Sequence, residues 1–324
     1  MTRGDAVIDV SGLAVQLPTA RGWVTPVNGV SLQIAAGECL GLVGESGSGK
    51  TMLSLALMRL LPTGARVSGS ANLLTSGGVK NLLTLDEREM RGLRGIALAM
   101  IFQEPMTSLN PVLRIGPQIE EAVRAHEAGL APRDVRERML AALRQAAVPE
   151  PELRSAQYPH QLSGGLRQRA MIAMALATKS RLLIADEPTT ALDVTVQKEI
   201  LELLQKLRRE LGLALLLITH DLGVVAQVAD RVAVMYAGRV IEEGPAKELL
   251  GAASHPYTKG LLAASPRLER GKLMPIPGTV PQLTALPPGC AFEPRCGVRR
   301  SDCAAAMPEL RQVSAEHAAR CVLV

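Results

Sequence analysis

The sequence contains few aromatic residues and no long apolar segment. Three Tyr, two Phe and one Trp make up the aromatic content, while 47% of the 324 residues are hydrophobic. A core of that size must therefore be aliphatic and rich in Ala and Met. The longest apolar run, residues 211–218, is far shorter than the roughly 20 residues that a membrane-spanning helix needs. We therefore expect a chain with a large aliphatic core that does not itself span a membrane.

Signals for export and for nucleic-acid binding are also lacking. Residues 1–7 contain no apolar core of a signal peptide, so we expect the chain not to be exported. The net charge is only +5, and no run of Lys and Arg resembles a nucleic-acid patch. This mild basic balance also suits a protein near an anionic membrane surface. In a reducing cytosol the five cysteines are not expected to form disulfides, so burial or metal binding must account for them.

The clearest motif, residues 44–51, fits the phosphate-binding pattern G-x-x-x-x-G-K-[ST]. A short apolar stretch, residues 39–43, precedes it, and a helical pattern, residues 52–61, follows it and ends before a proline. The glycines let backbone N–H groups face phosphate oxygens, Lys50 reaches the β- and γ-phosphates, and the Thr51 hydroxyl is placed to hold Mg²⁺. The predicted nucleotide-binding residues of this loop are Gly44, Glu45, Ser46, Gly47, Ser48, Gly49, Lys50 and Thr51.

Carboxylates at the end of another apolar segment suggest hydrolytic chemistry. Residues 182–185 predict a buried strand, and Asp186 and Glu187 follow at its C-terminal end, the edge where parallel sheets place their sites. We expect Asp186 to order the Mg²⁺ shell and Glu187 to take a proton from the attacking water or to orient it. His220 follows the next apolar strand and is placed to hydrogen-bond a γ-phosphate or a water. The alternative is that these are ordinary solvated strand ends.

Three further features fit a nucleotide site less specifically. Residues 163–165, Ser-Gly-Gly, open a helix, where the hydroxyl and free N–H groups form a second anion site. Gln103 ends a buried strand, residues 96–102, and its amide oxygen is placed to meet a metal or a water. Trp23, in a polar loop of residues 19–26, is placed to stack on a base. Taken alone, the Ser-Gly-Gly segment also fits a simple helix cap, Gln103 an ordinary loop residue, and Trp23 a loop anchor.

Taken in order, these motifs resemble those of the ATP-binding-cassette (ABC) ATPases over about residues 5–245. The resemblance implies an α/β fold: a P-loop ABC nucleotide-binding domain with a mixed sheet core, an antiparallel β subdomain and a helical subdomain, the last at about residues 112–178. We expect the ATPase domain to span residues 1–245 and a C-terminal domain to span residues 246–324. In this family two cassettes sandwich two ATP molecules head to tail, so the resemblance also implies ATP and Mg²⁺.

The resemblance assigns a role to each motif. Residues 44–51 are similar to the Walker A loop, and Gln103 to the lid glutamine that senses Mg²⁺ and the transmembrane partner. Residues 163–165 resemble the signature motif, which touches the γ-phosphate of ATP held by the opposing subunit. The remaining matches are Asp186 with the Walker B aspartate, Glu187 with the catalytic base, Asp193 with the dimer-contacting loop, His220 with the switch histidine and Trp23 with the adenine-stacking aromatic.

A narrower resemblance is carried by two further stretches. Residues 103–111 and 255–262 are similar to the di- and oligopeptide importer ATPases, and residues 166–175 look like the D member of their paired D and F subunits. This implies a heterodimer with a sister ATPase, two transmembrane permeases and an extracytoplasmic binding protein, with the chain peripheral on the cytoplasmic face of the inner membrane and without a nucleic-acid partner. The alternatives are an importer ATPase for nickel or another small solute, a soluble ABC ATPase outside transport, and a non-catalytic cassette.

Beyond Gly260 the composition shifts to an irregular tail that contains Cys290-x5-Cys296-x6-Cys303-x17-Cys321. The gaps exceed the two to four residues typical of structural zinc pairs. Four thiolates suit zinc or a [4Fe–4S] cluster, and reduced thiols without metal are the third alternative. The resemblance to cluster-bearing peptide-importer ATPases favours the iron–sulfur cluster. His317 is a competing ligand, and Cys39 is expected in the core.

Overall fold

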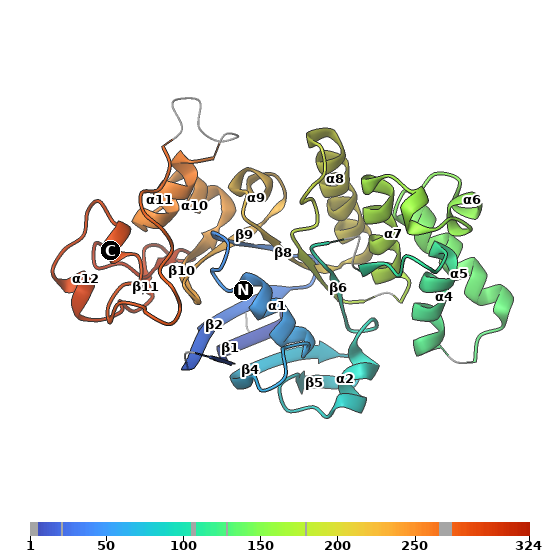
Figure 1. The fold of residues 1–324 in the computed structure, drawn as a ribbon, viewed down its shortest axis with the longest axis horizontal. Coiled ribbons are helices and arrows are strands. Elements are labelled where there is room, and N and C mark those ends of the chain that lie inside the picture. Colours follow the sequence, from blue (N-terminus) through green and yellow to red (C-terminus); the bar gives the residue numbers. More distant parts are fainter. Residues whose placement is uncertain (1–5, 21, 105–107, 128, 179, 266–273) are drawn as a thin grey trace. The chain divides into compact units, whose positions relative to one another are not determined.

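The structure, a computed structural model, describes residues 6–20, 22–104, 108–127, 129–178, 180–265 and 274–324. The chain divides into two compact units, each built from segments that are separate in the sequence (Figure 1). We call them the helical unit, mainly Ala35–Glu38 and Leu85–Leu215, and the phosphate-loop unit, which contains Ile8–Ile34, Cys39–Thr84 and Leu216–Val324. Residues 1–5, Arg21 of the predicted loop and residues 105–107 of the importer-like motif lie outside the described residues.

Helices dominate the helical unit, together with two parallel strands, β6 and β7. Residues 115–155, within the helical subdomain predicted at about residues 112–178, form three separate helices, because a proline opens the second at Pro132 and positive φ values at Ala147 (54°) and Glu150 (48°) interrupt the chain after it. The elements are α2 (Glu87–Leu93), β6 (Leu98–Ile101), α4 (Ile115–His126), α5 (Pro132–Gln145), α6 (Pro151–Ser155), η1 (Pro159–Gln161), α7 (Gly164–Leu176), β7 (Leu182–Asp186) and α8 (Val194–Leu211).

Packing within this unit follows the apolar periodicity of its sequence. The predicted inner face of α5 is buried, with Val135, Met139 and Leu143 each at most 1% exposed. Asp86 caps α2: its side chain accepts a hydrogen bond from the Glu89 N–H at 2.7 Å in a capping box. The predicted strand over residues 96–102 is shorter than expected, since its end residues Ile96 and Phe102 are exposed.

Two sheets form the phosphate-loop unit. The first is antiparallel, in the order β2-β1-β4-β5, and the second runs β11-β12-β10-β9-β3-β8, with β3 parallel and β10 antiparallel to β9. The elements are β1 (Ala6–Thr19), β2 (Gly22–Ala35), β3 (Cys39–Val43), α1 (Lys50–Met58), β4 (Arg66–Thr75), β5 (Gly78–Asn81), β8 (Ala214–Thr219), α9 (Leu222–Val228), β9 (Arg231–Tyr236), β10 (Arg239–Pro245), α10 (Ala246–Gly251), α11 (Pro256–Ala263), η2 (Glu293–Arg295), α12 (Asp302–Ala305), β11 (Arg311–Gln312) and β12 (Ala318–Ala319).

Four sequence predictions need correction in this unit. Trp23 lies in strand β2, because β1 and β2 extend to the turn between them. The helix after the phosphate loop ends at Met58, where Arg59 adopts a left-handed φ of 51°. Leu211 ends helix α8 at a Gly212 cap, so the strand β8 starts three residues later than predicted, at Ala214. The irregular tail is also partly ordered, since its strand β12 pairs with β10.

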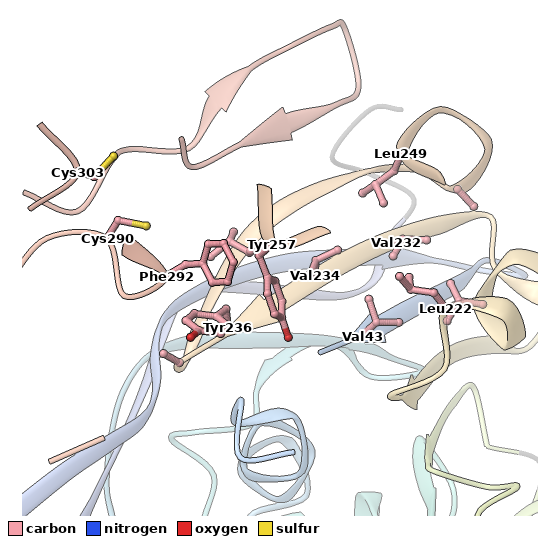
Figure 2. Packing of buried hydrophobic residues seen from close by; sticks show 14 residues of the cluster. Val43, Leu222, Val232, Val234, Tyr236, Leu249, Tyr257, Cys290, Phe292 and Cys303 are labelled. Atoms are coloured by element: carbon pink, nitrogen blue, oxygen red, sulfur yellow. The ribbon is translucent and has the colours of Figure 1, made fainter. Parts of the chain in front are cut away.

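One hydrophobic cluster joins the tail to the strands of this unit (Figure 2). Val43 of β3 and Val232 and Val234 of β9 are fully buried in it, and the tail contributes Phe292 and two cysteines. As the paucity of aromatic residues requires, most of its members are aliphatic. The sheet that leads into the phosphate loop and the cysteine-bearing tail therefore share one core.

Candidate functional site

The phosphate loop connects the buried strand β3 to helix α1 and is shaped by its glycines. Gly49 caps α1 with a φ of 103°, and a Cβ there would lie 1.9 Å from the backbone oxygen of Pro26. A Cβ on Gly44 would lie 2.2 Å from the backbone oxygen of Met235. By contrast, a Cβ on Gly47 (φ 79°) would meet no atom within 4 Å. The loop is therefore packed tightly against its own unit on one side and open on the other, as a phosphate cradle requires.

Lys50 lies inside this loop, with only 6% of its surface exposed. Its Nζ donates to the backbone oxygens of Gly44 at 2.8 Å and Glu45 at 3.1 Å and to Ser48 Oγ at 3.3 Å. The Thr51 side chain, one residue later in α1, is exposed. The ammonium group is thus held at the loop before any nucleotide is bound, and it supplies a positive charge beside the free N–H groups of a helix N-terminus.

Two other predicted residues belong to the phosphate-loop unit. His220 is exposed directly after β8, and the next residue, Asp221, caps α9 by accepting from the Gly223 N–H at 2.7 Å. The exposed indole of Trp23 has the Arg66 guanidinium 4.0 Å from its ring centroid, a cation–π contact. One face of the predicted base-stacking ring is therefore already covered by this unit.

In the helical unit, Asp186 and Glu187 lie at the C-terminal end of the buried strand β7, as predicted. Asp186 is the last residue of β7 and is 1% exposed. Glu187, half-buried, turns out of the strand with a φ of 47°, a conformation that costs roughly 1–3 kcal/mol for a residue other than glycine. Its Oε2 accepts from Gln103 Nε2 at 3.1 Å and from Thr190 Oγ1 at 2.8 Å. The structure thus brings Gln103 and Glu187 together, and it adds Thr190, which the motif analysis missed although it stands three residues after Glu187.

The Ser-Gly-Gly segment begins helix α7, where Ser163 Oγ accepts from the Leu166 N–H at 3.3 Å. Asp193 caps α8 in the same way, accepting from the N–H groups of Thr195 and Val196 at 3.1 and 3.0 Å. A Cβ on Gly165 would lie 2.7 Å from Val196 Cγ1, so the two helix starts approach too closely for a side chain at this position. The helical unit therefore presents two exposed, capped helix N-termini side by side.

The four tail cysteines line one small cavity, with a volume of about 10 Å³, in the phosphate-loop unit. Its remaining walls include Phe292, His255 and Pro308. Burial raises the pKa of the Cys290 and Cys296 thiols, so both are protonated at neutral pH when no metal is bound. All five cysteines are free of disulfides. Within the described residues, no three His, Cys, Asp or Glu side chains are positioned as a metal site.

The other predicted ligand candidates have structural partners. His317, 1% exposed, makes a hydrogen bond of 2.8 Å from Nε2 to Glu242 Oε1, and Glu242 is itself fully buried in β10. Glu242 also accepts from the N–H groups of Ser254 and His255. His317 therefore ties the tail to β10 and does not line the cysteine cavity. Cys39 is fully buried in β3, as expected for a core residue.

Comparisons with known proteins match both parts of the chain. Residues 27–190 match the family described as ABC transporter, and residues 241–303 match the oligopeptide/dipeptide transporter C-terminal region. The oligopeptide transport ATP-binding protein OppD of Salmonella typhimurium is 49% identical over 294 residues, which cover 90% of this chain and 86% of OppD. The dipeptide transport ATP-binding protein DppD of Bacillus subtilis is 47% identical over 322 residues, which cover 98% and 95%.

Solved structures show the same fold. The dimeric ATP-binding cassette MJ0796, in a post-hydrolysis state bound to ADP and Pi, aligns with a TM-score of 0.64 and 28% identity over 74% of this chain and 98% of that one. The parallel and antiparallel strands and the helices thus form the α/β P-loop fold of ABC nucleotide-binding cassettes. Among the described residues, no helix is both long enough and apolar enough to cross a membrane.

Proposed function

Because this chain belongs to the ABC transporter family, we propose that it is the subunit that hydrolyses ATP to power uptake of di- and oligopeptides. The observation that carries the proposal is the C-terminal region: residues 241–303 match the oligopeptide/dipeptide transporter region and follow a complete cassette. The chain is an ABC-type ATPase, and ATP and Mg²⁺ are the ligands that its family implies. Peptide as cargo rests on the resemblance of this region and on the relatives' names.

Ground-state binding of ATP is assigned to the phosphate loop. Lys50 Nζ, now on loop oxygens, exchanges these for β- and γ-phosphate oxygens, and the N–H groups of the open side of the loop donate to the same phosphates. Gly47 fits this role because a phosphate can approach its backbone without meeting a side chain. Thr51 and Asp186 are the oxygen donors suited to Mg²⁺, which when bound neutralises charge that develops on the phosphates. Trp23 is assigned to the adenine.

Turnover is assigned to Glu187, assisted by Gln103 and His220. The Glu187 carboxylate accepts the proton of the attacking water or orients that water, a general-base role. Gln103 donates to Glu187 Oε2 and so positions the carboxylate that is proposed to act on the water. His220, exposed at a strand end, donates to the γ-phosphate or the water.

The two helix N-termini of the helical unit are assigned to the opposing cassette. Ser163, Gly164 and Gly165 form an anion site for the γ-phosphate of ATP held by a sister ATPase subunit, and Asp193 contacts that subunit. A heterodimer of this kind, two permease subunits and an extracytoplasmic binding protein complete the proposed transporter, on whose cytoplasmic membrane face the chain lies. We place the ATPase domain at residues 1–245, with its helical subdomain at about residues 112–178, and the C-terminal domain at residues 246–324. In support, β10 ends at Pro245 and α10 begins at Ala246.

The four tail thiols are proposed to hold a metal centre, a [4Fe–4S] cluster with zinc as the alternative. Four soft donors around one cavity have the chemistry for either. The cavity of about 10 Å³ has room for little more than one water, so the thiols must move apart to admit a cluster. When bound, the metal cross-links three separate parts of the tail, and a cluster also offers one-electron chemistry.

Reconstitution tests the proposed cargo. The chain is assembled in proteoliposomes with its permeases and sister ATPase, and ATP hydrolysis is measured with the binding protein loaded with a peptide mixture or with Ni²⁺. We expect hydrolysis and uptake to rise with peptide. Stimulation by Ni²⁺ alone would replace the peptide proposal with a nickel importer.

Metal analysis after anaerobic purification tests the tail. We expect iron and sulfide in equal amounts, a brown protein, and loss of both in Cys296→Ser. The matched control, Cys39→Ala, removes a thiol outside the cavity and should retain the iron. Zinc without iron would favour the alternative, and metal content unchanged in Cys296→Ser would contradict a thiolate site altogether.

A further inference from the structure

Glu45, the second residue of the phosphate loop, is held by three different groups. Its N–H donates to Tyr257 Oη at 2.8 Å, and its backbone oxygen accepts from Lys50 Nζ at 3.1 Å. Its carboxylate receives two hydrogen bonds from the Arg295 guanidinium, at 2.7 and 3.0 Å. One loop residue therefore joins the phosphate-binding lysine to two side chains that come from more than 200 residues later in the sequence.

Arg295 is not a solvated surface partner. Its side chain is 5% exposed, and it lies in η2, between Cys290 and Cys296 of the cysteine cavity. Its Nε donates to the backbone oxygen of Pro277 at 2.9 Å, and its guanidinium lies 5.8 Å from the Phe292 ring. Bonding to the Glu45 carboxylate raises the pKa of Arg295, which stays charged at any relevant pH. The two hydrogen bonds from the Arg295 guanidinium fix the orientation of the Glu45 carboxylate as well as its distance.

The aromatic residues of this chain support the same contact. Tyr236, Tyr257 and Phe292, three of its five Tyr and Phe side chains, meet with ring centroids 4.6 to 5.4 Å apart (Figure 2). Tyr236 Oη also lies 3.4 Å from Arg295. Such pairs are rigid and well packed. A chain with few aromatic residues thus places half of its six beside the contact between Arg295 and Glu45.

We propose that Arg295 and Tyr257 are positioning residues for the nucleotide site: by fixing Glu45 they hold the phosphate loop in its binding conformation before ATP arrives. The C-terminal extension is in this view part of the nucleotide site, since two of its side chains order the loop. Without these two contacts the phosphate loop would lose conformational entropy when it binds ATP. The affinity for ATP would then fall, although the catalytic groups are unchanged. The inference rests only on nucleotide binding at the loop, so it stands or falls separately from peptide as the cargo.

Binding of MgATP to the purified full-length chain, measured by titration calorimetry, tests the proposal. We expect Arg295→Met to raise the ATP Kd about tenfold, the change produced by losing roughly 1.4 kcal/mol of preorganisation. Arg295→Lys should recover part of the affinity because it keeps the charge but loses the second hydrogen bond. The matched control is Arg299→Met, which removes an exposed arginine of the same tail that pairs with Glu293 at 3.3 Å, and it should leave the Kd within twofold.

Two further measurements separate positioning from general stability. Tyr257→Phe removes only the hydroxyl that accepts the Glu45 N–H and keeps the packed ring, so it should raise the Kd about threefold in a chain that is still folded. Hydrogen exchange of the peptide containing residues 44–49 should become faster in Arg295→Met before nucleotide is added. A Kd within twofold of wild type in both Arg295→Met and Tyr257→Phe would overturn the proposal.

A double variant, Arg295→Met with Glu45→Gln, tests directly whether Arg295 acts through Glu45. If Arg295 acts through the Glu45 carboxylate, Arg295→Met in a Glu45→Gln background should weaken binding by far less than it does alone. Fully additive effects would mean that Arg295 acts elsewhere, and the proposed connection would be wrong. A fall in thermal stability with an unchanged Kd would mean that the contact only supports the fold.

Discussion

The phosphate loop, to which we assign ATP binding, and the Glu187 turn, to which we assign turnover, are held by the chain in different ways. The loop is held by buried contacts: two of its glycines leave no room for a Cβ, Lys50 is buried against loop oxygens, and the buried Arg295 pairs with Glu45. Glu187 is held by side chains, Gln103 and Thr190, both of which are exposed. The proposed binding loop is therefore held by buried contacts, whereas the proposed catalytic carboxylate contacts two exposed side chains.

The largest expected effect tests the catalytic side of this comparison. Glu187→Gln keeps the shape and both hydrogen-bond partners but removes the base, so we expect kcat for ATP hydrolysis to fall at least about 100-fold, as for other general bases. The ATP Kd should stay within about twofold, since binding is assigned to the other unit. Steady-state hydrolysis by the assembled transporter and calorimetric binding to the chain measure the two values.

A matched control for this variant is Glu202→Gln, an exposed carboxylate of α8 that forms a 3.8 Å ion pair with Lys198. It should change neither kcat nor the Kd. If Glu187→Gln weakened binding as much as turnover, the separation of the two functions between the two regions would be wrong.

The second-largest expected effect tests ATP binding at the phosphate loop. Lys50→Met retains the length of the side chain and loses its charged donor, so the ATP Kd should rise at least about tenfold, since hydrogen bonds to charged groups contribute roughly 1.5–3 kcal/mol each. Thermal stability should fall as well, because Lys50 also bonds to two loop oxygens. If the variant lost stability but bound MgATP normally, Lys50 would stabilise the loop without contributing to nucleotide binding.

The third effect tests the close approach of two helix starts in the helical unit, at Gly165 and Val196. Gly165→Ala places a Cβ 2.7 Å from Val196 Cγ1 and should cost about 1–3 kcal/mol of folding stability through overpacking. Gly164→Ala is the control, because its Cβ would lie an ordinary 3.4 Å from Leu192 Cδ2. Thermal denaturation of both measures the difference.

Relief of the clash makes that test specific. Val196→Ala removes the methyl group that the new Cβ meets, so the double variant should regain most of the stability lost in Gly165→Ala. An equal loss in the double variant would mean that the glycine is required for its backbone conformation and not for the close approach of the helix starts.

Sequence reasoning predicted the elements that carry the proposed site residues because local patterns encode them. The phosphate loop, the strand ending at Asp186 and the capped starts of α7 and α8 each follow from neighbouring residues, and the structure has the corresponding local elements at all of them. The contact of Gln103 with Glu187 was not predicted; it arises because β6 and β7 pair in parallel, so that their carboxyl ends lie at one edge. Roles that depend on nucleotide or a second subunit stay predictions.

Contacts between distant parts of the sequence escaped that reasoning. Nothing near Arg295 indicates that it reaches Glu45, because the two are 250 residues apart. The tail was predicted to be irregular from its composition, and its strand β12 escaped detection because two residues are too few for an alternating pattern. Trp23 was placed in a polar loop of residues 19–26, but it lies in strand β2, which pairs in the antiparallel sheet.

The smallest expected effect concerns Trp23, the predicted residue that is least firmly held. Its exposed ring already contacts Arg66 on one face, so stacking on adenine adds only the other face. We therefore expect Trp23→Ala to raise the Kd for MgATP about threefold, at the low end for base–aromatic stacking. Binding of inorganic tripolyphosphate, which has the phosphates but no base, should be unchanged. Equal losses for both ligands would show that Trp23 supports the phosphate loop, and no loss for either would leave adenine recognition to other residues.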